Sequence, residues 1–374
     1  MRIIKYIFLL FLLSLVALSI FVATQKGDFL VERSKVINSP KSSIYNYVND
    51  YRNWSDFGTW TSQDPQIKIK YPKNTIGKGA SYSWEGKDGN GSMRTISVKE
   101  NDSIVQKMDF EGTSSTVFWK FKDTIGGTKV TWTSKGKMSF FFKIYSALQG
   151  GADHVIGGIY EKSLVNLDKA LDYEINTFSV IENGIVKKPI INYVGQTFTS
   201  EIDKVNKNFK IVIPKLSAFC EKNNIAISGK PFVLYHTYNA VKGIAKITIG
   251  IHIRDAIFLS AGSDIVAGKI DAFEGIKNTL TGDYTHLKTA YIKAVNYSNN
   301  NKLSLNPVFS RLVIYAVNKN DVKSPSRWVS EIYFPIIPKA APVPQTKKYS
   351  PAPTTQGVPD KETTPEAKDD EFEF

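Results

Sequence analysis

The sequence contains very little cysteine and histidine, and this scarcity excludes several kinds of functional site. The single cysteine, Cys220, can neither form an intrachain disulfide nor build a thiolate metal site. The four histidines lie far apart along the chain, and none has a partner at metal-ligand spacing. The motifs Gly-x-Ser-x-Gly, His-Glu-x-x-His and Cys-x-x-Cys are also absent. We therefore expect no metal and no cofactor, and the sequence assigns no catalytic residue.

Runs of positive charge are absent as well. Lys and Arg number 48 against 35 Asp and Glu, a formal net charge of +13, but no block of five or more basic residues occurs. This scattered charge does not predict a nucleic-acid partner. The stretch from Gly262 to Lys269 imitates a phosphate-binding loop, but it has one residue too many between its glycines and continues with Ile270 instead of Ser or Thr. Nucleotide binding is therefore not expected.

Aromatic residues, by contrast, are abundant. The chain has 6 Trp, 18 Tyr and 22 Phe among its 374 residues. Such a stock suits large apolar interiors or ligand cavities. The length suits two domains of about 150 residues each.

The N-terminal segment, residues 1–27, is predicted to be a membrane anchor. The run from Ile7 to Ala23 has no charged residue, and with the apolar residues before it the run reaches the length of a helix that crosses a bilayer. A cleaved signal peptide is the alternative, with Ala17-Leu18-Ser19 as a small-x-small cleavage site. Arg2 and Lys5 favour a cytoplasmic N-terminus, although further basic residues follow the run. We expect the folded domains on the exported, periplasmic side.

The other end of the chain, residues 339–374, is rich in Pro, Thr and acidic residues and has almost no aliphatic ones. It cannot bury enough apolar surface to offset chain entropy, so we predict a disordered tail.

The first folded block, residues 28–175, has the order of elements of a helix-grip domain. An alternating strand leads through Asn38-Ser39-Pro40 to a short helix with one apolar face, several strands follow, and a long helix from about Gly151 to Tyr173 closes the block. With the segments from Val48 to Trp54 and from Ile76 to Ala80, this order resembles the START-like (SRPBCC, polyketide cyclase type) domain. The resemblance implies a curved sheet that wraps the last helix and leaves an apolar cavity.

Tryptophans on the predicted strands of this block are candidates for lining that cavity. Trp84, Trp119 and Trp132 lie on strands, and we assign Trp84 and Trp119 to the ligand site. Core packing is the simpler interpretation of each ring. Trp54 and Trp60 fit better as plugs over the helix.

The second block, residues 183–338, contains an internal repeat. A helix, a turn and two strands recur, with Pro231 and Pro307 at matching places 76 residues apart, so each half is one strand-helix-strand-strand unit. Two such units give one antiparallel sheet with a concave face. The segment from Gly282 to Leu287, Asn306-Pro307 and the segment from Trp328 to Ile336 resemble the GyrI-like effector-binding domain of multidrug-sensing bacterial regulators.

The resemblance implies a small-molecule site but not the charge of its ligand. The chain reads Phe309-Ser310 where many relatives have Phe-Glu, so one acidic position is missing and a preference for cationic ligands does not carry over.

Four residues of the second block are predicted to bind the ligand. Glu331 and Tyr333 lie two apart on a strand, so their side chains share a face and would offer a charge and a ring to an aromatic or cationic molecule. The simpler interpretation makes Glu331 a structural carboxylate paired with Lys or Arg. Tyr235 and Tyr315 end equivalent strands and would flank the cleft, or else pack in the core. His252 and Glu331 fall on equivalent third strands of the two repeats, and a His-carboxylate pair could run acid-base chemistry.

The fold class predicted is α+β: a START-like domain and a duplicated GyrI-like domain behind one transmembrane helix. The function predicted is a membrane-tethered binding protein that senses, buffers or carries small hydrophobic or aromatic molecules. The alternative is a hydrolase or cyclase that acts on a small hydrophobic substrate in one of the pockets. A third possibility is an adaptor that binds envelope proteins through its tail.

Overall fold

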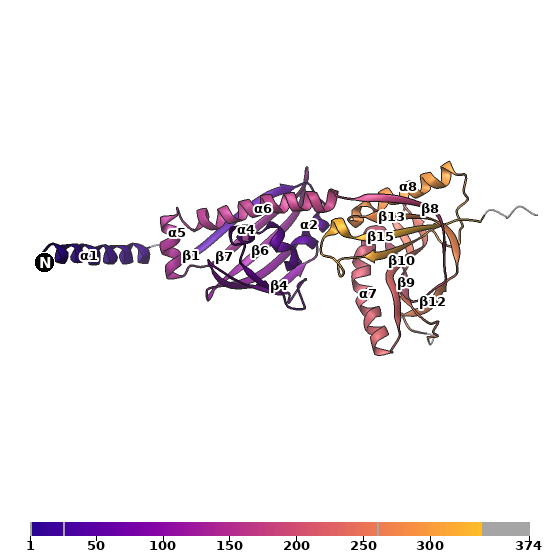
Figure 1. Ribbon diagram of the computed structural model, residues 1–374, viewed down its shortest axis with the longest axis horizontal. Helices are drawn as coiled ribbons and strands as arrows, with labels where there is room; N and C mark the ends of the chain where they lie inside the picture. The colour runs from indigo at the N-terminus through magenta and orange to yellow at the C-terminus, as the bar shows by residue number, and fades with distance from the viewer. Residues whose placement is uncertain (1, 25–26, 260–261, 339–374) are drawn as a thin grey trace, which may run out of the picture. The chain divides into compact units, whose positions relative to one another are not determined.

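A computed structural model describes residues 2–24, 27–259 and 262–338 of the chain. These residues form an α+β fold with two antiparallel sheets and eight α-helices (Figure 1). The α+β class predicted from the sequence is confirmed. The disorder predicted for residues 339–374 concerns a segment outside the described residues.

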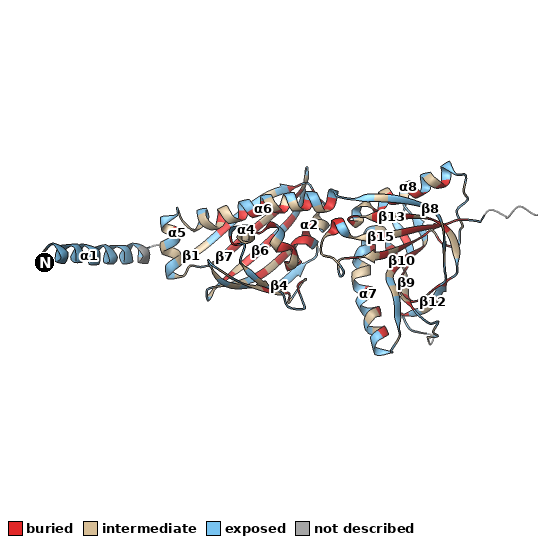
Figure 2. Cartoon of the chain, in the orientation of Figure 1, coloured by how far each residue is buried: buried red, intermediate tan, exposed pale blue. Residues whose placement is uncertain are grey.

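Helix α1 (Arg2–Thr24) is the apolar N-terminal segment. Its stretch Ile3–Phe21 is long and apolar enough to cross a bilayer, and none of that stretch is buried against the rest of the protein (Figure 2). A signal sequence has the same length and composition. The membrane anchor therefore stays a prediction.

The first sheet has seven strands in the order β1-β7-β6-β5-β4-β3-β2, and each neighbouring pair is antiparallel. Its strands are β1 (Asp28–Ile37), β2 (Lys68–Lys70), β3 (Ser81–Gly86), β4 (Gly89–Lys99), β5 (Ser103–Phe110), β6 (Thr113–Thr124) and β7 (Gly127–Lys137). The helices of this half are α2 (Lys41–Val48), α3 (Trp54–Phe57), α4 (Thr59–Gln63), α5 (Phe140–Leu148) and α6 (Ala152–Asn176), with the 3-10 turn η1 (Tyr51–Asn53).

The long helix α6 packs its apolar stripe against the first sheet. Tyr160, Leu164, Leu167 and Leu171 recur at spacings of three and four and are all buried. Aromatic rings fill the interior between helix and sheet: Trp119 stacks on Trp132 with ring centroids 4.2 Å apart, and Trp132 stacks on Tyr160 at 4.0 Å. These rings occupy the space where the sequence predicts a hollow.

The second sheet has eight strands in the order β12-β9-β11-β10-β14-β15-β13-β8. Its strands are β8 (Ser179–Lys188), β9 (Ile191–Glu201), β10 (Ile227–Asn239), β11 (Ile244–Ile253), β12 (Val266–Ile270), β13 (Phe273–Thr281), β14 (Arg311–Val317) and β15 (Val329–Pro335). The accompanying helices are α7 (Val205–Lys222) and α8 (Leu287–Asn300), with the 3-10 turns η2 (Ile202–Lys204), η3 (Tyr284–His286) and η4 (Pro325–Arg327).

The repeat predicted from the sequence is present in the order of these elements. One unit is β9-α7-β10-β11 and the other is β13-α8-β14-β15, and they join where β10 pairs with β14. The edge strands are exchanged: β8 comes before the first unit but pairs with β13, whereas β12 comes before the second unit but pairs with β9. Only two residues separate β8 from β9, although their pairing partners lie towards opposite edges of the sheet. The sheet must therefore curl strongly.

The second sheet has two faces of different kinds, because helices cover only one of them. We call the face under α7 and α8 the helix-covered face and the opposite face the inner face. Buried side chains of the helix-covered face include Val233, Ile249, Val313 and Ile332. The inner face has its own apolar cluster, formed by Ile191, Tyr193, Phe232, Leu234, Ile270, Phe309, Leu312 and Tyr333.

Candidate functional site

A cavity of about 200 Å³ lies on the inner face of the second sheet. The cavity is built at the place where β8 gives way to β9, beside the central strands of the sheet. The residues that line it are Lys188, Ile191, Gly229, Lys230, Phe232, His252, Ile314, Ala316 and Glu331. An apolar wall with a few polar groups is the usual composition of a small-molecule site.

Glu331 and Tyr333 point together to the inner face, as the alternation of side chains along β15 predicts. The hydroxyl of Tyr333 donates to Glu331 Oε2 at 2.7 Å, and Lys277 Nζ donates to Glu331 Oε1 at 2.7 Å. Burial alone would raise the pKa of Glu331, but the hydrogen bonds from Lys277 and Tyr333 outweigh burial and hold the pKa below its ordinary value. Glu331 is therefore ionised, and each of its oxygens already accepts a hydrogen bond.

Lys188 brings a second ammonium group to the same place. Its Nζ lies 3.5 Å from the hydroxyl of Tyr333 and 4.9 Å from the centroid of the Tyr333 ring. Burial lowers the pKa of Lys188, and the nearby charge of Glu331 opposes this effect. Among the described residues, no carboxylate oxygen lies within 4.0 Å of Lys188 Nζ. The strong carboxylate contact in this cluster therefore belongs to Lys277.

His252 lies on β11 and its ring packs against the backbone of Gly229. A Cβ atom added to Gly229 would lie 2.4 Å from His252 Nδ1, so a larger residue there would force the His252 ring to move. Burial lowers the pKa of His252, and the charge of Lys188 lowers it further, which favours the neutral imidazole. His252 and Glu331 line the same cavity, but no hydrogen bond joins them within the described part of the chain.

Tyr235 and Tyr315 lie on the other side of the sheet from Glu331. Both belong to the helix-covered face, where Tyr235 is 6% and Tyr315 is 1% exposed. The Tyr315 ring packs against Phe209 and Tyr284, with centroids 4.6 Å and 5.0 Å away. The structure does not bring these two tyrosines to the cavity, because they alternate with the cavity-facing residues of their own strands.

A buried arginine that the sequence gave no reason to single out lies beside Tyr235. The guanidinium of Arg311 lies over the rings of Tyr238, Tyr291 and Tyr235, with its central carbon 3.8 Å, 4.3 Å and 5.2 Å from their centroids. Arg311 is 6% exposed, and its Nε has no hydrogen-bond partner among the described residues. Cation–π contacts take the place of a carboxylate here.

The two tryptophans predicted to bind a ligand in the first block belong to the apolar cluster of the first sheet, Trp119 within it and Trp84 packed against it. Trp119 is 1% exposed and donates through Nε1 to Gln106 Oε1 at 3.1 Å. Trp84 is half-buried and packs against Tyr82 and Phe110, with ring centroids 5.3 Å and 6.3 Å apart. The structure therefore places these rings as packing groups.

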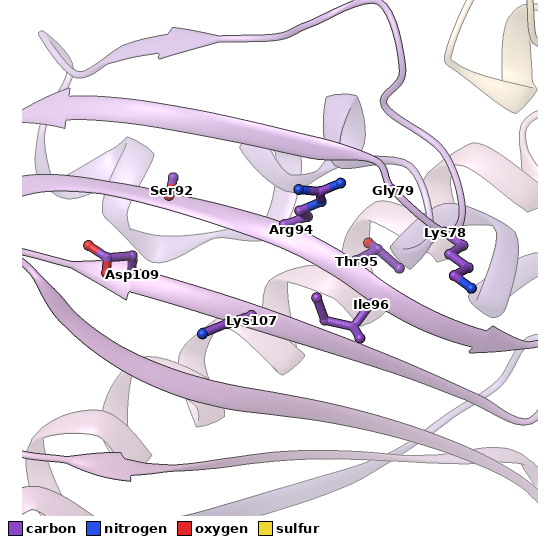
Figure 3. A pocket seen from close by; sticks show the side chains of 8 residues that line it. All are labelled: Lys78, Gly79, Ser92, Arg94, Thr95, Ile96, Lys107 and Asp109. Carbon is purple, nitrogen blue, oxygen red and sulfur yellow. The ribbon is translucent and has the colours of Figure 1, made fainter.

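A second hollow, of about 380 Å³, lies on the outer side of the first sheet (Figure 3). Its walls are largely polar side chains of β4, β5 and the loop before β3: Lys78, Gly79, Ser92, Arg94, Thr95, Ile96, Lys107 and Asp109. Arg94 and Lys107 stand opposite each other on neighbouring strands, and both are exposed. This hollow lacks the enclosed apolar wall of a site for hydrophobic molecules.

Comparison with solved structures finds distant likenesses. The C-terminal domain of EcmrR is 16% identical, with 43% of this chain and 98% of that domain covered and a TM-score of 0.38. EcmrR in a complex with DNA is 15% identical, with 53% of this chain and 71% of that chain covered and a TM-score of 0.37. A protein from Chromobacterium violaceum is 10% identical, with 38% of this chain and 96% of that chain covered and a TM-score of 0.31.

No family model matches the chain, and no curated protein matches its sequence. The TM-scores above are all below 0.5, so the likenesses assign neither a family nor a function.

Proposed function

We propose that the protein is a membrane-anchored binding protein for small hydrophobic or aromatic molecules, which it senses, buffers or carries. The cavity on the inner face of the second sheet is the proposed binding site. The observation that carries the proposal is the apolar wall formed by Ile191, Phe232 and Ile314 beside the charged groups of Lys188 and Glu331. An apolar wall supplies binding energy, and a few fixed polar groups set orientation.

The size of the cavity limits the ligand. About 200 Å³ is below the range of roughly 300–1,000 Å³ that holds drug-sized molecules. A molecule of one or two rings suits this space. We assign the ligand to the second sheet, because in the interior of the first sheet the rings of Trp119, Trp132 and Tyr160 stack on one another.

The domain organisation in this proposal follows the sequence. Residues 28–175 form the START-like domain and residues 183–338 the GyrI-like effector-binding domain, with α1 as the anchor that holds both on the exported side. The support for the second assignment is the duplicated strand-helix-strand-strand order. The support for the anchor is the length and apolar composition of Ile3–Phe21.

Binding of an uncharged probe tests the proposal. Isothermal titration of the detergent-solubilised full chain with 2-naphthamide should give one site, and Ala316→Leu should weaken binding at least tenfold because the added atoms fill the cavity. Ala218→Leu is the matched control, since Ala218 is exposed on α7, and it should leave the affinity unchanged. Native mass spectrometry of the purified chain should also detect a bound small molecule. Equal affinity of the wild-type chain and the Ala316→Leu variant would contradict the proposal.

The alternative is a hydrolase or cyclase, and the cavity holds one feature that bears on it: His252 and Glu331 line the same space. An enzyme that uses Glu331 as a base would lose turnover in Glu331→Gln. A binding protein would keep its affinity for an uncharged probe within about threefold in the same variant, because the apolar wall is unchanged.

A further inference from the structure

The cluster around Tyr333 contains more positive than negative charge. Two ammonium groups, those of Lys188 and Lys277, flank a single carboxylate, that of Glu331. The ammonium group of Lys277 lies 2.7 Å from the carboxylate of Glu331, and their two charges cancel. Lys230, the other lysine of the wall, pairs with Asp321 at 2.9 Å. The charge of Lys188 is left without a close carboxylate among the described residues.

Lys188 brings this charge to the wall of the cavity. Lys188 lines the cavity beside the apolar residue Ile191, and its ammonium group lies over the face of the Tyr333 ring. A half-buried ammonium group that makes only weak contacts has lost hydrogen bonds to water without gaining strong ones from the protein. This loss is energetically unfavourable. An anion in the cavity would supply the missing partner.

A cationic ligand meets the opposite situation. The oxygens of Glu331 already accept hydrogen bonds from Lys277 and from Tyr333. A cation would have to displace Lys277 and would lie near Lys188 as well, and like charges repel strongly where water is scarce. The cavity therefore disfavours the cationic molecules that a lone carboxylate would attract.

We propose that the cavity takes a small apolar molecule with an anionic head, a carboxylate, which pairs with Lys188 while its body packs against Ile191, Phe232 and Ile314. This inference rests on the proposed function, because it assumes that the cavity is the ligand site. It adds the chemical class of the ligand: an aromatic or aliphatic acid.

Three probes with one ring system and different charge test the inference: 2-naphthoate, 2-naphthamide and 2-naphthylmethylammonium. Titration of the full chain should show 2-naphthoate binding at least tenfold tighter than 2-naphthamide, and the ammonium probe weakest. Lys188→Gln should lower the affinity for the acid at least tenfold and the affinity for the amide much less, so that the preference for the acid is lost. Lys187→Gln is the matched control: its side chain is 87% exposed and pairs with Glu274 at 3.6 Å. It should preserve the preference.

The outcomes separate the two claims. Equal affinity for all three probes, or a preference for the ammonium probe, overturns the anionic-head inference while the proposed function stands. A preference for the acid that survives in Lys188→Gln overturns the assignment of its partner. Failure of all three probes to bind overturns the proposed function, and the inference with it.

Helix α5 exposes most of its large apolar side chains. Phe140, Phe141, Tyr145 and Leu148 are 54%, 80%, 55% and 75% exposed on a helix of nine residues. Such a concentration of exposed rings and aliphatic groups is unusual on a surface that faces water only. An apolar helix face of this kind requires a partner.

The chain connects α5 closely to the end of α1. The backbone N–H of Met138, two residues before α5, donates to the carbonyl oxygen of Gly27 at 2.8 Å, and β1 pairs with β7 from Asp28 onward. Gly27 follows the last residue of α1, Thr24, by three positions. Three residues span at most about 10 Å, so α5 begins close to the point where α1 ends.

We infer that α5 lies in the headgroup region of the bilayer that α1 crosses, with Phe141 and Leu148 inserted towards the acyl chains. Amphipathic helices rich in aromatic residues bind membrane interfaces in this way. The inference rests on α1 as the membrane anchor.

Spin labels test this placement, and the chain suits them because its one cysteine, Cys220, is buried. Labels at Phe141→Cys and Leu148→Cys of the full chain in phosphatidylcholine vesicles should collide more often with oxygen than with a water-soluble nickel complex. A label at Val241→Cys, which replaces a side chain that is 97% exposed, should show the reverse. Nickel accessibility at position 141 equal to that at 241 overturns the inference. A label at Leu10→Cys that collides more often with the nickel complex than with oxygen lies outside the lipid. That result would show that α1 is not a membrane anchor.

Discussion

Lys277 and Glu331 form an ion pair across the ladder between β13 and β15, with 2.7 Å between Nζ and Oε1. The pair is diagonal, because Lys277 stands opposite Tyr333 and Glu331 stands opposite Thr279 in the register. The two side chains are 21% and 26% exposed. The pair therefore lies largely out of solvent, where loss of one partner leaves a costly charge behind.

Glu331→Gln should lower the free energy of unfolding at pH 7 by about 1–2 kcal/mol, because Lys277 loses its charged partner. The folded-state pKa of Glu331 lies below its ordinary value, so the carboxylate stabilises the fold fully above about pH 4.5. This contribution is lost as the pH falls through the lowered pKa. Denaturant unfolding of the wild-type chain and of the variant should be measured across this pH range. The difference between their free energies of unfolding should shrink as the pH falls.

Glu182→Gln is the control for that measurement. Glu182 pairs with Lys293 at 3.9 Å, and both side chains are 42% exposed. The change should cost at most about 0.5 kcal/mol, since exposed pairs contribute little. A loss in Glu331→Gln no larger than in Glu182→Gln would mean that the central pair does not stabilise the fold.

Gln106→Leu should destabilise the fold by about 1–3 kcal/mol, because the buried Trp119 Nε1 loses its hydrogen-bond acceptor and the Tyr51 hydroxyl keeps only its contact with Thr95 Oγ1 at 2.9 Å. Gln106 accepts from Trp119 Nε1 at 3.1 Å and donates to the hydroxyl of Tyr51 at 3.0 Å. Lys107→Gln, next in sequence and exposed, should change stability by less than about 0.5 kcal/mol. Thermal unfolding followed by near-ultraviolet circular dichroism checks both values, and indistinguishable midpoints would refute this account of the core.

Arg311→Lys should be more destabilising than Arg311→Met. A lysine ammonium cannot stack on the rings of Tyr238 and Tyr291 as the planar guanidinium does, so its burial is less well compensated. A methionine removes the buried charge and keeps an apolar stem, a change that is often neutral. We expect a loss of about 1–3 kcal/mol for the lysine variant and less than about 1 kcal/mol for the methionine variant in denaturant unfolding. The opposite order would show that the charge itself is required.

Alternation along one strand predicts that Glu331 and Tyr333 share a face, and the structure places them so. The same rule could not place Tyr235 and Tyr315 relative to Glu331, because that relation depends on how β10, β14 and β15 pair and on which face the helices cover. Neither feature is local in sequence.

The cationic part of the site was not predicted for a related reason. Lys188 reaches Tyr333 because β8 pairs with β13 at the far edge of the sheet, across an exchange of edge strands that no local pattern encodes. The aromatic composition of the chain predicted large apolar interiors or ligand cavities. It could not predict whether the rings leave a space, because stacking such as that of Trp119 on Trp132 is set by tertiary packing.

Nuclear Overhauser effects from bound 2-naphthamide to isoleucine methyl groups would show whether a small aromatic molecule binds in the cavity of the second sheet. In the methyl-labelled full chain, we expect contacts from the probe to the δ1 methyl groups of Ile191 and Ile314, and none to Ile104 in the core of the first sheet. Contacts to Ile104 without contacts to Ile191 and Ile314, or saturable binding with no contact to the second sheet, would contradict this expectation.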